Sequence, residues 1–255
     1  MANQSYNNNN IPARQKEVKL LDEAFMHQII SSRNEKTVLT GFTSLDQILH
    51  RGLHPNLIIL GGGTGAGKTS FVLQIADYIA ASGRDVLFFS LEMSKWELIA
   101  KSISRISWQM DPDNALTAAE IMYDYGIWEP DPELRMNFEE AKGHYFRNIA
   151  PHFFIDEGSL FMTFEKIRIS IRDHIESYIS TPVVIIDYIQ LLRGSDPGTS
   201  EKQTMDEVIY GLENIRREFR TPVIGLSSLN RGAYGSKTKG TNIRTDSFKE
   251  SGSIE

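Results

Sequence analysis

The sequence contains no cysteine among its 255 residues. This absence excludes disulfides, cysteine-based zinc sites and thiol catalysis, and it is compatible with a reducing cytosol. No apolar run approaches the roughly 20 residues that a membrane-spanning helix requires. The first ten residues are polar and rich in asparagine, without the apolar stretch of an export signal. A cytoplasmic location with no membrane partner is therefore expected.

The sequence also has no excess of positive charge, since its formal net charge is −6. This balance argues mildly against nucleic-acid binding, for which a basic face is the usual mark. Net charge is a global sum, however, and a protein that grips a nucleic-acid backbone needs positive charge only at the point of contact. The length and the 40% content of hydrophobic residues suit one large domain with a substantial core.

Short apolar runs alternate with helical patterns along most of the chain. The runs predict buried strands at 57–60, 86–89, 153–155, 183–186 and 223–226. Helical patterns cover 70–81, 95–106, 117–125, 132–147, 164–178 and 205–219. This alternation predicts an α/β fold with a mostly parallel sheet flanked by helices on both faces.

The segment before this domain has a different character. Residues 1–13 are polar and predict a disordered tail. Residues 14–36 predict a linker helix, because apolar side chains, Val18 and Phe25 among them, fall on one helical face. Packing on its own domain is the commoner fate of such a helix. The alternative is docking on a neighbouring subunit.

Residues 62–69 match the phosphate-loop pattern G-x-x-x-x-G-K-[ST] between a predicted strand and a predicted helix. The glycines let backbone N–H groups point inward at phosphate oxygens, and the helix N-terminus favours the same anion. Lys68 is expected to reach the β- and γ-phosphates, and Thr69 to hold Mg²⁺. The expected nucleotide-binding residues are Gly62, Gly63, Thr64, Gly65, Ala66, Gly67, Lys68, Thr69 and Ser70.

Two carboxylates are candidates for the chemistry beside this loop. Asp187 ends the apolar run 183–186, as a magnesium-binding Walker B aspartate does. Glu92 follows the run 86–89, so it would lie at the sheet edge where ligands bind and could polarise an attacking water. From the residues alone, Glu92 could equally be a helix N-terminal glutamate that only favours the helix dipole.

An ordered set of segments resembles the C-terminal motor domain of DnaB-type replicative helicases, in the RecA-like P-loop superfamily. The segments are 40–46 (TGFTSLD), 90–94 (SLEMS), 186–192 (IDYIQLL), 227–231 (SSLNR) and 249–255 (KESGSIE). The resemblance spans 37–255. Clock and repair ATPases of the KaiC and RadA types share the first segment and the phosphate loop, but lack the DYIQL and ESGxIE patterns.

The resemblance implies a homo-hexameric ring that hydrolyses ATP, with Mg²⁺, between subunits and translocates on single-stranded DNA in replication. It implies that Glu92 is the catalytic base, acting with Lys68, and that the loops after Asp187 and after Arg231 contact DNA. It also implies a polar sensor formed by Ser228, Asn230 and Arg231.

The predicted loop 232–245 carries the candidate DNA-binding residues Lys237, Lys239 and Arg244. Composition alone favours a solvated surface loop. Its position in a helicase-like domain favours contact with the DNA backbone instead. Trp108, Trp128 and Tyr145 could stack on bases, but packing in the core is the commoner role of such aromatics.

The sequence departs from the family pattern in three respects. Ser228 stands where the family usually has glutamine, which replaces an amide by a single hydroxyl. The family's N-terminal helical domain has no counterpart. Relatives also continue beyond the point that matches Glu255, with further strands and an arginine finger for the neighbouring site. A truncated nucleotide-binding paralogue that does not unwind DNA, or a regulatory or recombination ATPase, is therefore the alternative expectation.

Overall fold

The computed structural model describes residues 18–27, 37–158, 162–194 and 198–228. The chain divides into two units, residues 1–37 and 38–255. In the first unit, residues 18–27 are helical, within the predicted linker helix. Its apolar side chains are exposed, with 60% of Val18 and 63% of Phe25 accessible. The predicted tail 1–13 lies outside the described residues.

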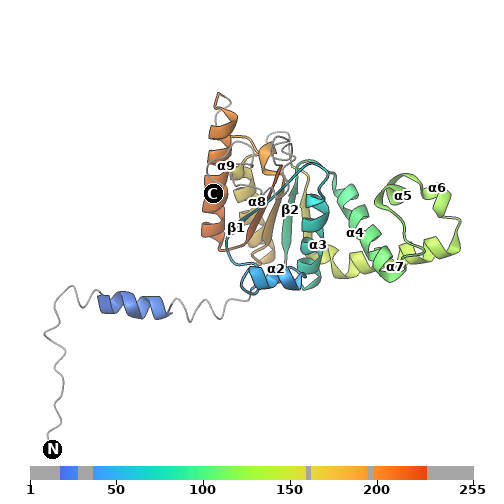
Figure 1. The fold of residues 1–255 in the computed structure, drawn as a ribbon, viewed down its shortest axis with the longest axis horizontal. Coiled ribbons are helices and arrows are strands. Elements are labelled where there is room, and N and C mark those ends of the chain that lie inside the picture. Colours follow the sequence, from blue (N-terminus) through green and yellow to red (C-terminus); the bar gives the residue numbers. More distant parts are fainter. Residues whose placement is uncertain (1–17, 28–36, 159–161, 195–197, 229–255) are drawn as a thin grey trace, which may run out of the picture. The chain divides into compact units, whose positions relative to one another are not determined.

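The second unit is built on a parallel sheet, which lies between the helices in Figure 1. Its strands lie in the order β1-β5-β4-β2-β3. The strands are β1 (Leu57–Gly62), β2 (Val86–Ser90), β3 (Phe153–Asp156), β4 (Val183–Asp187) and β5 (Val223–Ser228). Each predicted strand is present, and each extends by one or two residues toward its carboxyl end. These extra residues carry the sheet up to the polar side chains that follow it.

Helices connect the strands and cover both faces of the sheet. They are α2 (Thr43–Ile48), α3 (Lys68–Ala81), α4 (Lys95–Met110), α5 (Ala118–Tyr123), α6 (Tyr125–Trp128), α7 (Pro132–Asn148), α8 (Phe164–Tyr178) and α9 (Glu201–Phe219), with short 3₁₀ turns η2 (Ala150–His152) and η3 (Ile189–Leu191). Side-chain caps fix several starts. Ser94 and Glu97 form a reciprocal capping box at α4, and Ser200 and Gln203 do so at α9.

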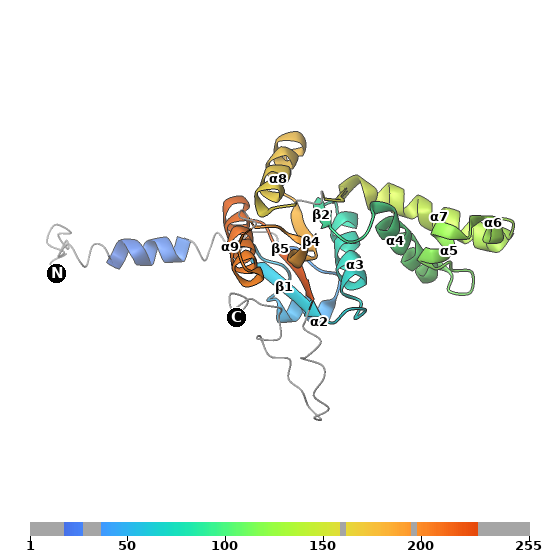
Figure 2. The same ribbon diagram turned by 90° about the horizontal axis from the view of Figure 1, so that it is seen from above.

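Successive residues of the central strands point to opposite faces, because side chains alternate along a strand. Val86 and Phe88 pack with α3 and α4 in one core cluster. Leu87 and Phe89 pack with α8 and α9 in the other. Figure 2 shows α8 and α9 on one side of the strands and α3 on the other. The prediction of a parallel sheet with helices on both faces is confirmed.

The helices α5, α6 and α7 extend away from the sheet together with the end of α4 (Figures 1 and 2). Trp128 is only 3% exposed, and its indole N–H donates to the carbonyl of Glu120 at 2.9 Å. Tyr145 is 1% exposed. Core packing is therefore the role of these two rings, and base stacking is excluded for them. Trp108 is exposed.

Asp85, just before β2, lies at the edge of the sheet where the strands begin. Its carboxylate oxygens are 2.8 Å from Nδ1 of His152 and 3.1 Å from Nε2 of the buried His174. Burial alone would raise the pKa of Asp85. Hydrogen bonds with His152, Ser180 and His174 outweigh burial and hold this pKa below its ordinary value. This carboxylate therefore stabilises the fold in its ionised form.

Across the parts of the chain that the structure describes, we find no helix that is both long and apolar enough to cross a membrane.

Candidate nucleotide-binding site

The loop between β1 and α3 is a tight turn that depends on glycine. Gly65 and Gly67 have φ values of 77° and 86°, in the left-handed region where any other residue is strained. Gly67 is the N-cap of α3, and its carbonyl accepts from the N–H of Phe71 at 2.9 Å. The helix therefore starts directly at Lys68, with its first-turn N–H groups at the loop. This arrangement favours an anion.

The Lys68 ammonium is held over the same loop. Its Nζ donates to the carbonyl of Gly62 at 2.9 Å and to that of Gly63 at 3.1 Å. A Cβ on Gly62 would lie 3.2 Å from Cγ of Lys68, so glycine makes room for the lysine stem. A phosphate in the loop would therefore meet a cation whose position is already set by the backbone.

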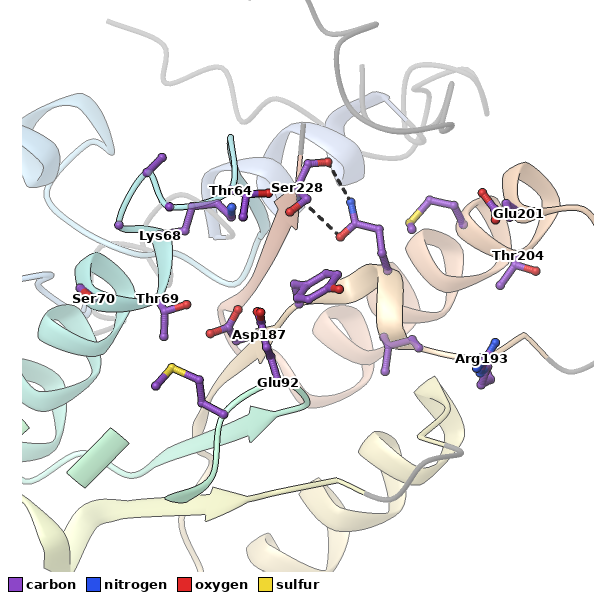
Figure 3. A pocket seen from close by; sticks show the side chains of 18 of the residues that line it. Thr64, Lys68, Thr69, Ser70, Glu92, Asp187, Arg193, Glu201, Thr204 and Ser228 are labelled. Atoms are coloured by element: carbon purple, nitrogen blue, oxygen red, sulfur yellow. Dashed lines mark hydrogen bonds between the residues drawn. The ribbon is translucent and has the colours of Figure 1, made fainter. Parts of the chain in front are cut away.

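Asp187 lies beside the phosphate loop, at the carboxyl end of β4, whose other residues are fully buried and apolar. The Thr69 hydroxyl lies beside its carboxylate and acts to lower its pKa, and Figure 3 shows the two side chains facing each other. Asp187 is 2% exposed, and within the described residues its Oδ2 has no hydrogen-bond partner. A hydroxyl and a carboxylate with an unused buried oxygen are the donors that Mg²⁺ prefers. These residues therefore fit a magnesium ion.

The surroundings of Asp187 raise the pKa of its carboxyl group. Burial raises its pKa, and the nearby charge of Glu92 adds to that shift. The Thr69 hydroxyl and the Lys68 ammonium oppose the shift without cancelling it. A buried carboxylate whose ionised form has too few partners favours binding of a cation.

Glu92 lies on the other side of Asp187, in the turn after β2. The N–H of Leu91 donates to the carbonyl of Asp187 at 2.8 Å, which ties this turn to the end of β4. The Ser90 hydroxyl donates to the carbonyl of Met93 at 2.5 Å and tightens the turn. Glu92 is exposed to solvent beside Asp187 (Figure 3). Its carboxylate can therefore reach a water in the cavity.

A cavity of about 1080 Å³ joins these groups. Of the predicted site residues, those that line it are Thr64, Gly65, Ala66, Gly67, Lys68, Thr69, Ser70, Glu92, Asp187 and Ser228. Gly62 contributes the carbonyl that holds Lys68, as does Gly63. The predicted sensor residues Asn230 and Arg231 lie outside the described residues, as do Lys237, Lys239 and Arg244.

The cavity is also lined by residues to which the sequence assigned no role. They are Met93, Lys101, Thr163, Tyr188, Gln190, Leu192, Arg193, Gly194, Thr199, Glu201, Thr204 and Met205. Gln190 lies in the segment 186–192, which resembles the helicase family. That resemblance was the only sequence feature that could have indicated this residue, and it assigned no role to it. Figure 3 shows Arg193, Glu201 and Thr204 in the part of the cavity away from the phosphate loop. They come from a turn and a helix far from that loop in sequence.

The fold and the loop geometry define a P-loop domain of the RecA-like class. Comparison with known families gives a more specific result. A family model described as the DnaB-like helicase C-terminal domain matches residues 37–255, and the chain belongs to this family. The match does not favour the alternative of a KaiC- or RadA-like regulatory or recombination ATPase.

Curated relatives agree with the family match. The chain is 31% identical over 230 residues to a probable replicative DNA helicase from Trieres chinensis, covering 88% of this chain and 47% of the relative. It is 31% identical over 222 residues to the replicative DNA helicase DnaB of Pasteurella multocida, covering 86% and 44%. The chain thus spans less than half the length of these relatives.

Solved structures show the same fold. An isolated ATPase domain matches with a TM-score of 0.78 at 23% identity, covering 92% of this chain and 79% of that one. A DnaB-like replicative helicase, described together with its interactions with primase, matches with a TM-score of 0.75 at 22% identity, covering 97% and 55%. At this level of identity the likeness concerns the fold alone.

Proposed function

We propose that this chain is the ATP-hydrolysing motor of a replicative DNA helicase and that it moves on single-stranded DNA. The observation that carries the proposal is one cavity in which a phosphate loop, a magnesium-type carboxylate and a solvent-exposed glutamate meet. Membership of the DnaB-like family supports helicase activity as the use of this chemistry. A replication motor would act in the cytoplasm, in line with a sequence that has no cysteine.

Binding of ATP follows from the loop. Its backbone N–H groups and the start of α3 would hold the phosphates, and the Lys68 ammonium would lie on the β- and γ-phosphates. Thr69 and Asp187 would hold Mg²⁺, which supplies positive charge against the developing charge of the transferred phosphoryl group. Thr64 and Ser70 line the cavity beside these groups.

Hydrolysis needs a group that orients water and accepts its proton. Glu92 is suited to this role because its carboxylate is exposed and lies beside Asp187 (Figure 3). Ser228 lines the cavity at the end of β5, where the polar sensor 228–231 is expected. A hydroxyl at this point would contact the γ-phosphate before hydrolysis and lose that contact afterwards. This difference would be transmitted to the residues that follow Ser228.

Contact with DNA would come from two places. After Asp187 the chain brings Arg193 to the part of the cavity away from the phosphate loop (Figure 3). Lys237, Lys239 and Arg244 would add positive charge without sequence preference. Local charge of this kind would be compatible with the net charge of −6, because contact with the DNA backbone needs few residues.

Assembly into a hexameric ring is part of the proposal, with each ATP between two subunits. The helix at 18–27 supports it, because apolar side chains fall on one of its faces. Its exposed apolar residues Val18, Leu21 and Phe25 would be covered by docking on a neighbouring subunit.

The test is steady-state ATP hydrolysis by the purified chain, with and without oligo(dT), alongside a forked-duplex unwinding assay. We expect magnesium-dependent hydrolysis that single-stranded DNA stimulates, with the Lys68→Ala variant as the inactive control. Tight ATP binding without hydrolysis under either condition would refute the motor and favour a nucleotide-binding subunit. Hydrolysis that DNA does not change would refute the DNA-coupled function.

A further inference from the structure

Among the residues that the structure describes, the last residues of β5 have a strand neighbour on only one side. The β4–β5 pairing runs from Val184 and Val223 to Ile186 and Gly225, and ends there. The β1–β5 pairing continues for three residues beyond Gly225, as far as Gly62 opposite Ser228. The segment 226–228 therefore lacks a β4 partner where it reaches the cavity.

The Gln190 side chain takes the place of the missing strand. Its Oε1 accepts from the N–H of Ser228 at 3.4 Å, and its Nε2 donates to the carbonyl of Ser228 at 3.3 Å. These are the two dashed contacts at Ser228 in Figure 3. Nε2 also donates to the Ser227 hydroxyl at 2.7 Å. A carboxamide offers one acceptor and two donor hydrogens, so it can pair with a peptide group as a strand does.

The backbone fixes the place of this carboxamide. Gln190 is the middle residue of η3, whose first residue, Ile189, is fully buried. A Cβ on Gly225 would lie 2.8 Å from Cγ2 of Ile189, so glycine lets η3 pack directly on β5. The turn itself follows Asp187 by a single residue. The position of Gln190 is therefore tied to that of the magnesium-type carboxylate.

We infer that Gln190 is a positioning residue, which sets Ser228 against the phosphate loop in register with Asp187. Ser228 pairs with Gly62, whose carbonyl also holds Lys68. One side chain thus joins the end of β4, the end of β5 and, through Ser228, the edge of the loop. This inference rests on the proposed hydrolysis of ATP at this cavity, and it deepens that proposal by naming the group that aligns its parts.

The test replaces Gln190 by methionine, which keeps the length and volume of the side chain but cannot make the hydrogen bonds. Gln109→Met is the matched control, because Gln109 is an exposed glutamine on α4 away from this cavity. In Gln190→Met we expect kcat for ATP to fall roughly 10- to 100-fold, the scale of a misplaced active-site group. KM for ATP and the melting temperature should stay near those of the control, because the phosphate loop and the core are intact.

Amide hydrogen exchange tests the contact itself. In Gln190→Met the Ser228 amide should exchange about fivefold to tenfold faster, the factor for one ordinary hydrogen bond, whereas amides at Val223 and Ile224 should not change. The positioning role would be overturned if exchange at Ser228 or kcat did not change. It would also be overturned if KM rose and the melting temperature fell along with kcat. A wild-type chain that does not hydrolyse ATP would instead refute the proposed function. The exchange result would still decide whether Gln190 holds Ser228.

Discussion

The same substitution, Asp→Asn, should have opposite effects on stability at two buried aspartates, Asp187 and Asp85. Asp187 lies at the carboxyl end of β4 with Oδ2 unpartnered among the described residues, and burial raises its pKa. Asp85 lies at the opposite edge of the sheet, and its hydrogen bonds outweigh burial and lower its pKa. Asp→Asn removes the charge at either site with little change in volume. We expect Asp187→Asn to stabilise the apo protein and Asp85→Asn to destabilise it.

Asparagine at position 187 would be buried but uncharged; a buried group without partners costs about 1–3 kcal/mol, and a charged one costs more. For a unit the size of residues 38–255, each kcal/mol shifts the melting temperature by roughly 2–4 °C. Asp187→Asn, which keeps an acceptor for the Thr69 hydroxyl, should therefore melt a few degrees above wild type at pH 7.5 in EDTA. Asp85→Asn should melt lower by a similar amount, because the contacts with His152 and His174 weaken.

The pH dependence has a sign that can be checked. Because the pKa of Asp187 is higher in the folded state than in the unfolded state, ionisation of Asp187 lowers stability. This loss develops as pH rises from the unfolded-state pKa through the folded-state pKa. The advantage of Asp187→Asn is thus fully present above the folded-state pKa and is lost as pH falls to the unfolded-state pKa. The lowered pKa of Asp85 means that its contribution is present above the unfolded value and is lost as pH falls through the folded value. The deficit of Asp85→Asn should also shrink in acid.

Adding Mg²⁺ and ATP should reverse the order of wild type and Asp187→Asn. At 100 times the dissociation constant a ligand stabilises the folded state by about 2.7 kcal/mol, and only the wild type should gain this fully. Thermal denaturation with EDTA and with MgATP provides the assay. The reasoning about burial is refuted if Asp187→Asn and Asp85→Asn both melt below wild type in EDTA. The magnesium role is refuted if MgATP raises the melting temperature of Asp187→Asn as much as that of wild type.

Three further predictions concern the proposed motor. Lys68→Ala should abolish tight binding of ATP–Mg²⁺, because it removes the side-chain cation of the loop; unchanged affinity by titration calorimetry would contradict this. Glu92→Gln should leave nucleotide binding nearly intact and slow hydrolysis by roughly 10²-fold or more, and an equal loss of both would indicate a structural glutamate. Neutralising Lys237, Lys239 and Arg244 together should weaken binding to single strands of any sequence and flatten its salt dependence, whereas an unchanged slope would indicate a solvated loop.

Much of this site could be predicted from the sequence because its parts are local patterns. The phosphate loop is specified by glycines at fixed spacing between an apolar run and a helical pattern, and each piece forms from near neighbours. The strand before Asp187 is a run of fully apolar residues, which only a two-sided burial explains. The parallel sheet follows from the alternation of such runs with helices.

The role of Gln190 could not be predicted, because it depends on where β4 stops pairing with β5. At that end point Ile189 packs closely on Gly225, and the two residues are 36 positions apart in the sequence. The burial of Trp128 is a similar case, since its partners Glu120 and Phe138 come from separate helices. Register and helix packing are long-range properties, and no local period encodes them.

By itself, therefore, the sequence determined the class of fold, the phosphate loop and the identity of the two candidate carboxylates, Asp187 and Glu92. Only the tertiary structure decided how these parts meet. It placed Glu92 in solvent beside a nearly buried Asp187, and it joined Ser228 to Gln190 at the edge of the loop. The physical reason is that motifs arise from short-range backbone geometry and hydrophobic period, whereas electrostatics and alignment arise from burial between segments far apart in the chain.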